Sequence, residues 1–586
     1  MLKTYFFKKN IRTIVTCFLL SGFVIAWYGF MNQYLCLFYR EQSQLFLFDR
    51  DYFLQYLRMP GGLTAYFASF LIQFFRFRWI GVLIYLCVFL CLYVVTKAIY
   101  KNFSVFNHSF FIAFIPGLLY LPASINMLFD PADELGVILA LCGFIALTKL
   151  MENKYYYFLI PLSVTVLYIL VGGNVIISLS LFMLYSLSRS PLKYALVVML
   201  SLPIPVIVWY FFYFLSFKAA CFSLTPFRYP DAVLFNSNTI AWLSVIILPI
   251  IGMLLKNIKT GKKWIFMLNS GLAVVLLSLV IKQYNPDLEN IVKMGFDAEN
   301  RRWEEVVETG KKTVVSPLGC FYTNLALLQT GQLAEKMFHY DQIGISGLFI
   351  DSKDHFSYYA KSELFYRLGW INPAQHSAYE SMSGYSFIKE PNIRNLKRLY
   401  DCSAIQQNRS LTTKYGNMLN RSLFYGNYVK RQERNADYPT ALVMKNSLIR
   451  NMPEVLEIVL EDNSANQAVF EYLMAWYLLE RDFEQAKVIF DRYFSSLPYT
   501  HIPMHYAEFL LLYKRINNLD DSFYERYPIS RELSERFDMM DTLVQSTIDK
   551  MIRKTLEDNF KHTYWFYVRF PLVQIKTTPK DEKYIY

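Results

Sequence analysis

The sequence lacks the motifs by which many enzymes are recognised. It contains no nucleotide-binding glycine loop, no kinase signature, no His-Glu-x-x-His zinc motif and no nucleophile elbow. The seven histidines are scattered, and Pro503 between His501 and His505 argues against a helical metal-binding pair. These absences weigh against an enzyme in the second half of the chain.

Cysteines with the spacing of a metal site are also missing. Cys87 and Cys91 are four residues apart in the apolar run Ile84–Val95, where we expect them to pack against lipid or another helix. Cys320 and Cys402 are the only cysteines of the second half. Their spacing leaves open whether they pair. The sequence predicts no metal site from cysteine.

Apolar runs of membrane-spanning length are absent after Lys282 but recur before it. A spanning helix needs roughly 20 mostly apolar residues. We expect an all-α protein, with a polytopic transmembrane bundle of about nine spans over residues 1–282 and a soluble α-helical repeat domain over 283–586. The expected spans are Ile11–Met31, Trp79–Tyr100, Phe110–Phe129, Glu134–Met151, Tyr155–Val171, Gly173–Leu187, Pro191–Phe217, Thr239–Leu255 and Trp264–Ile281.

Two features bear on the span count. The first apolar run, Ile11–Met31, follows basic residues, as the apolar segment of a signal peptide does. No small-residue cleavage site comes after it, so we expect this segment to be kept as the first transmembrane span. Between residues 155 and 190, one long apolar stretch is interrupted only by Gly172-Gly173-Asn174. We interpret these three residues as a tight turn or a helix break.

The basic residues predict the orientation. The formal net charge is +12, but no basic motif accompanies it, so we expect no nucleic-acid binding. The basic residues instead gather in every second connection between the expected spans. The connection Asp130–Glu134, on the opposite side, contains no basic residue. Positive charges mark cytoplasmic connections. We therefore expect a cytoplasmic N-terminus and, with nine spans, a periplasmic C-terminal domain. An even number of spans would place the C-terminal domain in the cytoplasm. The orienting residues are Lys3, Lys8, Lys9, Arg12, Lys97, Lys101, Lys149, Lys154, Arg189, Lys193, Lys256, Lys259, Lys262 and Lys263.

An outer loop of residues 32–78 separates the first two expected spans. Pro60-Gly61-Gly62 is followed by apolar residues at helical spacing, which predict a helix with one apolar face. The helix is too short to span. It either lies in the membrane interface, with Arg76 and Arg78 at the headgroups, or packs onto the bundle. The apolar positions are Leu63, Tyr66, Phe67, Phe70, Leu71, Phe74 and Phe75.

Two acidic groups face the same outer compartment in this topology. One is Asp49 with Asp51, and the other is Asp130 with Asp133 and Glu134. Carboxylates at a membrane surface can hold a divalent cation or act as a general base toward a hydroxyl. They can equally make surface ion pairs, as with Arg50, or cap the next helix. Both interpretations stay open.

The second half shows helical periodicity and a degenerate repeat. Helices are expected over Asn300–Lys312 and from Pro317 to Thr330. A pattern recurs in three places: leucine, then a turn, then an alanine followed four positions later by an aromatic residue or a second alanine. This pattern resembles tetratricopeptide-repeat hairpins, and the resemblance extends from about Pro286 to Asn518. The three places are Leu327–Phe338, Leu364–Ala378 and Leu478–Phe490. A plain irregular helical domain is the alternative.

Two resemblances extend this interpretation. The segment from Asp51 through Pro60-Gly61-Gly62-Leu63 to Phe75 resembles an uncharacterised family of multi-pass membrane proteins of Bacteroidota, a domain of unknown function that brings no activity with it. The topology is similar to that of membrane glycosyltransferases that use lipid-linked sugars. That likeness implies a base at Asp49 or Asp51 and a second acidic site at Asp130, Asp133 or Glu134.

We expect an inner-membrane protein whose periplasmic tail binds a protein partner in envelope assembly or polymer handling. The alternative is the lipid-linked-sugar transferase, which would also use a divalent cation. Stabilisation of the departing lipid phosphate would then fall to Arg50, Arg58, Arg76 or Arg78. A transporter ranks third, because the expected spans are poor in polar residues.

Overall fold

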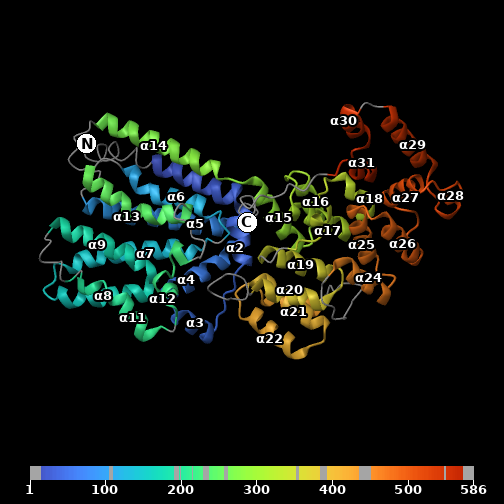
Figure 1. Ribbon diagram of the computed structural model, residues 1–586. Coiled ribbons are helices and arrows are strands. Elements are labelled where there is room, and N and C mark those ends of the chain that lie inside the picture. Colours follow the sequence, from blue (N-terminus) through green and yellow to red (C-terminus); the bar gives the residue numbers. More distant parts are fainter. Residues whose placement is uncertain are drawn as a thin grey trace. The chain divides into compact units, whose positions relative to one another are not determined.

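The computed structural model describes residues 15–103, 110–127, 129–189, 197, 199–213, 215–228, 236–255, 262–351, 355–382, 392–434, 451–546 and 549–571. Every regular element in these ranges is a helix, so the predicted all-helical class is confirmed (Figure 1). The chain divides into two compact units. The first unit comprises Met1–Glu289 with Asn420–Gly426, and the second comprises Asn290–Leu419 with Asn427–Tyr586.

The first unit is a bundle centred on α7. This helix packs against α5, α8 and α9, and α13 packs against α6. Asp130 caps α7 by accepting a hydrogen bond from the Ala132 amide at 2.8 Å, and Pro131 occupies the first helical position. The helices are α2 (Tyr39–Gln42), α3 (Arg50–Leu57), α4 (Gly62–Ile72), α5 (Arg78–Asn102), α6 (Ile115–Ala123), α7 (Pro131–Leu150), α8 (Tyr156–Val171), α9 (Val175–Arg189), α11 (Ile204–Phe212), α12 (Phe217–Cys221), α13 (Ser237–Leu255) and α14 (Lys262–Lys282).

Three helical stretches among the described residues are long and apolar enough to cross a membrane. They are Arg78–Lys101, Pro131–Leu150 and Tyr156–Ser186. A fourth is added if Val15–Met31 and Tyr34–Gln42, which meet at an angle of 83°, form one span. The remaining expected spans correspond in part to shorter apolar helices: Ile112–Ala123, Met199–Phe211, Ser237–Met253 and Gly271–Lys282. The structure thus shows fewer full-length candidates than the nine expected from the sequence.

Parts of the orientation argument lie outside the described residues. These are Lys3, Lys8, Lys9 and Arg12 at the N-terminus and Lys193, Lys256 and Lys259 further along. Inside the described stretch, Gly172-Gly173-Asn174 forms the short helix η5 (Gly172–Asn174), and Gly172 has a φ of 57°. The predicted break at these residues is therefore confirmed.

The helix predicted after Pro60-Gly61-Gly62 is α4, which packs against α7 and α8. Its buried side chains are mostly small, including Ala65, Ala68 and Ser69. Phe67, from the predicted apolar face, is 54% exposed. The helix therefore meets the bundle through its small residues, because short side chains let helix axes approach closely. The predicted apolar face is only partly exposed, since Phe75 at its end is 1% exposed.

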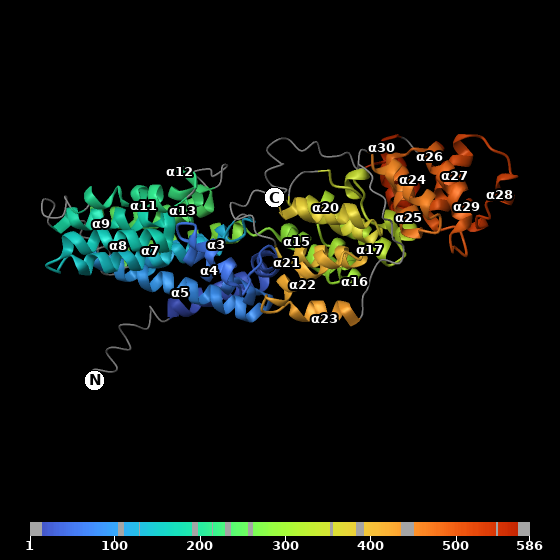
Figure 2. The same cartoon turned by 90° about the horizontal axis from the view of Figure 1, so that it is seen from below.

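The second unit consists of successive helices, many of which pack as antiparallel neighbours (Figure 2). The helices expected near 300–312 and 317–330 are confirmed as α16 and α17. The elements are α15 (Pro286–Glu299, which begins in the first unit), α16 (Trp303–Gly310), α17 (Pro317–Gln329), α18 (Leu333–Lys336), α19 (His355–Arg367), α20 (Ile371–Met382), α21 (Ile393–Ile405), α22 (Arg409–Asn420), α23 (Gly426–Arg434), α24 (Met452–Asp462), α25 (Gln467–Glu480), α26 (Phe483–Tyr493), α27 (Met504–Ile516), α28 (Phe523–Arg526), α29 (Arg531–Ser546), α30 (Asp549–Phe560) and α31 (Tyr564–Arg569).

Each of the three repeat-like patterns falls on a helix–turn–helix. The turns lie between α17 and α18, between α19 and α20, and between α25 and α26. Each contains one residue in the left-handed region: Gly331 (φ 65°), Gly369 (φ 79°) and Arg481 (φ 61°). Such a residue ends a helix and turns the chain back. Cys320 and Cys402, whose pairing the sequence left open, are both buried free thiols.

Candidate functional site

The two carboxylates predicted as a base occupy different environments in the first unit. Asp49 precedes α3 and pairs with Arg421 at 3.2 Å. The Phe48 amide also donates to the Arg421 carbonyl at 3.0 Å. Asp51 lies in the first turn of α3 and is exposed, and it makes no ion pair with any residue that the structure describes. Of the two, Asp51 is the carboxylate available to a substrate.

The four predicted phosphate-binding arginines divide into two pairs. Arg50 and Arg58 are exposed at the two ends of α3. Arg76 lies over the ring of Tyr425 at 4.9 Å, and Arg78 lies over the ring of Phe30 at 4.6 Å. These stacked guanidinium groups are held by aromatic rings. Arg76 is nevertheless exposed, whereas Arg78 is half-buried, and Arg50 and Arg58 are the two arginines that flank Asp51 along α3.

The second predicted acidic group forms a compact cluster at the start of α7. Arg228 pairs with Asp130 at 3.2 Å and with Asp133 at 3.3 Å. The Asn238 amide donates to Asp133 at 3.4 Å. We call Asp130, Asp133, Glu134 and Arg228 the α7 cluster. Asp130 thus caps α7, as one of the two interpretations predicted, and also pairs with Arg228.

Glu134 differs from its two neighbours in the α7 cluster. Its side chain is 4% exposed, yet it forms no hydrogen bond or ion pair with a described residue. The phenols of Tyr28, Tyr85 and Tyr120 lie within electrostatic range of it. The Tyr120 hydroxyl also has no hydrogen-bond partner in the part of the chain that the structure describes. Burying a carboxylate without a partner is costly, so Glu134 is the least compensated acid of the cluster.

Arg40 orders the loop that leads into the α7 cluster. Its guanidinium donates to the carbonyls of Ser124 at 3.1 Å and Met127 at 2.8 Å, and also to those of Asn126 and Phe129. Its side chain is 5% exposed. Neither Arg40 nor Arg228 was predicted from the sequence as part of a site. The only available signal was an arginine close to apolar runs, which does not identify a partner about ninety residues away.

Two glycine motifs that are far apart in the sequence meet beside this cluster. The Gly61 amide donates to the Ile169 carbonyl at 3.0 Å, and the Gly173 amide donates to the Ser223 carbonyl at 2.9 Å. A Cβ on Gly61 would lie 2.5 Å from Leu224 Cδ1 and 3.0 Å from the Gly172 nitrogen. The segments 60–62, 172–174 and 223–225 therefore form one tightly packed glycine junction.

The glycine junction also contacts α7. The Asn174 side chain donates to the Leu224 carbonyl at 2.7 Å and accepts from the Trp242 indole at 2.7 Å. A Cβ on Gly136 of α7 would lie 2.4 Å from the Asn174 amide nitrogen. The position of the α7 cluster thus depends on glycines in three segments.

The described residues contain no group of three or more His, Cys, Asp and Glu side chains arranged to hold a metal ion. In the α7 cluster, the positive charge beside Asp130 and Asp133 is the guanidinium of Arg228. Chemically, the first unit therefore offers one exposed carboxylate on α3 and one buried, uncompensated carboxylate on α7.

Comparison with known families gives one match. Residues 8–571 match the family described as a family of unknown function, DUF6057. The chain belongs to this family. The expectation of an uncharacterised family is confirmed in this form, and the family description brings no activity with it. No curated protein and no solved structure matches the chain.

Proposed function

We propose that this DUF6057 protein is an integral protein of the bacterial inner membrane. Its N-terminus is cytoplasmic, the first unit spans the bilayer about nine times, and the second unit is a periplasmic helical-hairpin domain of the tetratricopeptide type. The second unit binds a partner in envelope assembly or polymer handling. In this proposal the first unit lies in the lipid bilayer and the second unit lies in water.

One observation carries the membrane assignment. Large apolar side chains are exposed along many helices of the first unit, for example Leu83 (57%), Phe158 (70%) and Val274 (65%). A water-soluble surface rarely exposes so extended an apolar area. The apolar helices Arg78–Lys101 and Tyr156–Ser186 support the same assignment. Shorter helices such as Ser237–Met253 can complete spans together with their flanking residues.

The orientation is tested with alkaline phosphatase, which is active only outside the cytoplasm. A fusion after Tyr586 is expected to be active, and a fusion in the Lys149–Lys154 connection is expected to be inactive. The reverse pattern would place the tail in the cytoplasm and contradict the proposal. Deleting residues 451–586, which leaves Asn420–Gly426 in the first unit, should also abolish recovery of a crosslinked partner, and unchanged recovery would contradict the binding role of the tail.

The exposed carboxylate of Asp51 favours a second candidate function, transfer of a sugar from a lipid-linked donor. Asp51 and Arg58 are seven positions apart, so they project from the same face of α3, separated by about 10 Å along the axis. In this proposal Asp51 takes the proton of the acceptor hydroxyl. Arg58 and Arg50 stabilise the departing phosphate.

Asp49 provides a matched control for the transferase proposal, because its carboxylate is engaged by Arg421. We expect Asp51→Asn to fail to complement an envelope-glycan defect of the deletion strain, while Asp49→Asn complements it. Immunoblotting of membrane fractions checks that both variants accumulate equally. Full complementation by Asp51→Asn would show that Asp51 is not the base and would contradict the transferase proposal.

A further inference from the structure

Exposed aromatic rings and two arginines gather where the membrane-capable helix α5 begins. The apolar stretch of this helix starts at Arg78, and the Trp79 ring beside it is exposed. Phe77 and Phe30 are exposed as well, and Phe30 meets Trp79 edge-on with the ring centroids 5.8 Å apart. An exposed tryptophan at the end of a span is typical of the boundary between hydrocarbon and headgroups. We call Phe30, Phe77 and Trp79, with Arg76 and Arg78, the aromatic rim.

The two arginines of the aromatic rim have no anionic partner among the described residues. Neither forms an ion pair or a hydrogen bond there, and the buried Nε of Arg78 is unpartnered. Arg76 is exposed and lies over the Tyr425 ring at 4.9 Å. Arg78 lies over Phe30 at 4.6 Å and over Trp79 at 4.8 Å. A guanidinium that stacks on a ring keeps its N–H edge available for an oxyanion. The aromatic rim therefore offers two cations to an external anion.

The segment Asn420–Gly426, which belongs to the first unit, packs on the aromatic rim. The Phe424 ring lies against Phe77 with centroids 5.3 Å apart, and against Phe74 at 5.7 Å. The neighbouring Tyr425 ring is the one that Arg76 covers. We call Asn420–Gly426 the return segment. Its aromatic contacts place it at the end of the α5 span, although it comes from the second half of the sequence.

The return segment presents an apolar and a cationic side chain to its surroundings. Leu423 is 44% exposed, and Arg421 is exposed although it pairs with Asp49. A single exposed leucine is common on soluble proteins. Leu423, however, precedes the ring that packs on Phe77, at the end of a helix whose exposed side chains are apolar. An apolar side chain next to an arginine suits the bilayer interface, where one enters the acyl boundary and the other stays among headgroups.

From this arrangement we infer that the return segment and the aromatic rim together bind phospholipid of the bilayer surface. The phosphodiester lies at Arg76 and Arg78, the acyl chains follow α5 beyond Trp79, and Leu423 enters the acyl boundary. A phospholipid is the occupant because it supplies both an anion for the two guanidinium groups and hydrocarbon for the adjoining apolar surface. The inference rests on the proposed membrane location of the first unit. The sequence allowed Arg76 and Arg78 at the headgroups, whereas the return segment was expected in water.

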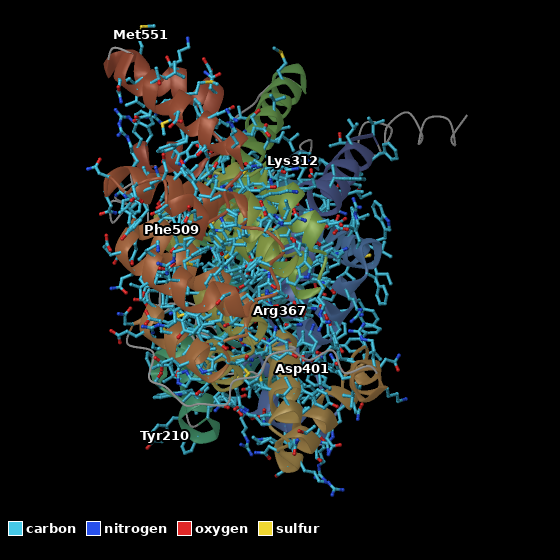
Figure 3. All side chains as sticks on the ribbon, turned by 90° about the vertical axis from the view of Figure 1, so that its right-hand side faces the viewer. Tyr210, Lys312, Arg367, Asp401, Phe509 and Met551 are labelled. Carbon is cyan, nitrogen blue, oxygen red and sulfur yellow. The ribbon has the colours of Figure 1, made fainter. Side chains whose placement is uncertain are left out.

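Photocrosslinking in cell membranes tests the position of the return segment. Benzoylphenylalanine replaces one exposed residue at a time: Leu423, Leu83 in the apolar stretch of α5, or Met551 in the second unit. Figure 3 shows the Met551 side chain projecting from α30. We expect phospholipid adducts, identified by mass spectrometry of tryptic peptides, at Leu423 and Leu83 but not at Met551.

The two control positions separate failure of the inference from failure of the membrane assignment. Adducts at Leu83 without adducts at Leu423 would overturn the inference and leave the membrane assignment intact. Equal labelling of Leu423 and Met551 would overturn it too. An absence of adducts at both Leu83 and Leu423 would contradict the membrane assignment, and the inference with it.

The variant Arg76→Gln tests the phosphate contact. Native mass spectrometry of the full-length protein in neutral detergent measures binding of added phosphatidylglycerol. We expect about tenfold weaker binding for Arg76→Gln, because a charge-assisted hydrogen bond to the phosphate is lost. Arg531→Gln is the matched control, since Arg531 is an exposed arginine of the second unit that pairs with Glu535. Parental binding by Arg76→Gln, or an equal loss in Arg531→Gln, would overturn the inference.

Discussion

Glu363 and Asp401 are buried carboxylates of one cluster whose pKa values shift in opposite directions. Burial raises the pKa of both, but the guanidinium groups of Arg398 and Arg367 outweigh burial at Glu363 and lower its pKa to about 2. At Asp401 burial prevails over Arg398 and raises the pKa to about 6. The number and proximity of cations decide the sign of the shift. Neither environment is visible from the sequence spacing.

The pKa of Glu363 predicts acid sensitivity. Because the folded pKa of about 2 lies below the ordinary value of 4.5, the ionised side chain stabilises the fold above about pH 4.5. This contribution is lost as the pH falls toward 2. We expect Glu363→Gln to cost about 3–5 kcal/mol at pH 7, because it leaves guanidinium groups without their counter-ion. It should also reduce the loss of stability between pH 7 and pH 3, measured by thermal unfolding in detergent.

The exposed Glu535 provides the control for this measurement, since its ion pair with Arg531 lies at the surface. Glu535→Gln should leave both the stability and its pH dependence close to those of the parent. If Glu363→Gln loses as much stability as the parent on acidification, the ion pairs of Glu363 are not the source of the acid sensitivity.

At the scale of elements, the glycine junction explains how short loops fix the bundle helices of the first unit. Gly61, Gly172 and Gly173 allow three backbone segments to come within hydrogen-bonding distance of one another. A side chain at any of these positions would collide with a neighbouring segment. From the sequence, Gly172-Gly173-Asn174 was predicted to be a turn or a helix break, and Pro60-Gly61-Gly62 was seen only to precede a helix. No local pattern indicates that these two motifs are in contact.

We expect Gly61→Ala to destabilise the protein by about 2–4 kcal/mol, since the added Cβ meets Leu224 and the φ is 78°. Gly331→Ala isolates the backbone contribution, because Gly331 has a φ of 65° but open space around it. It should cost only about 1 kcal/mol. The measurement is the fraction of monodisperse protein that remains after heating in detergent. Equal losses for the two variants would show that crowding at the junction contributes nothing.

At the scale of the whole molecule, the chain contributes to the first unit twice. Residues up to Glu289 build it, and Asn420–Gly426 returns to it. Within the first unit, the Tyr425 hydroxyl donates to Glu41, which is 5% exposed, and the Phe424 ring packs on Phe77 at 5.3 Å. Glu41 therefore receives a hydrogen bond from a residue almost four hundred positions away. The first unit is complete only when the later segment is present.

Truncation after residue 289 should accordingly weaken the first unit. The shortened chain loses the contacts of Asn420–Gly426, and a buried carboxylate loses a charge-assisted hydrogen bond, which costs about 1–3 kcal/mol. We expect faster proteolysis of residues 1–289 in the truncated chain than in the full chain. Tyr425→Phe in the full chain should show a smaller effect in the same direction. Equal proteolysis of the truncated and full chains would contradict a structural role for the segment.

The sequence by itself determined the helical class, the change from apolar to charged composition near Lys282, the break at Gly172–Asn174 and the helical hairpins of the second half. These features follow from local properties, since periodicity, chain-breaking residues and hydropathy act over a few turns of helix. Asp51 and the α7 carboxylates were also identified as candidates, because acidic residues between apolar runs are visible in a linear sequence.

Only the tertiary structure decided which charges meet. Arg228 neutralises Asp133, Arg421 engages Asp49, and Arg398 reaches Glu363, all across long sequence separations. The strength of such a pair depends on distance and burial, which no local pattern encodes. For the same reason the ion pairs of Glu299 and Glu363 could not be predicted: they join residues of α15, α19 and α21, which meet only once these helices are packed together.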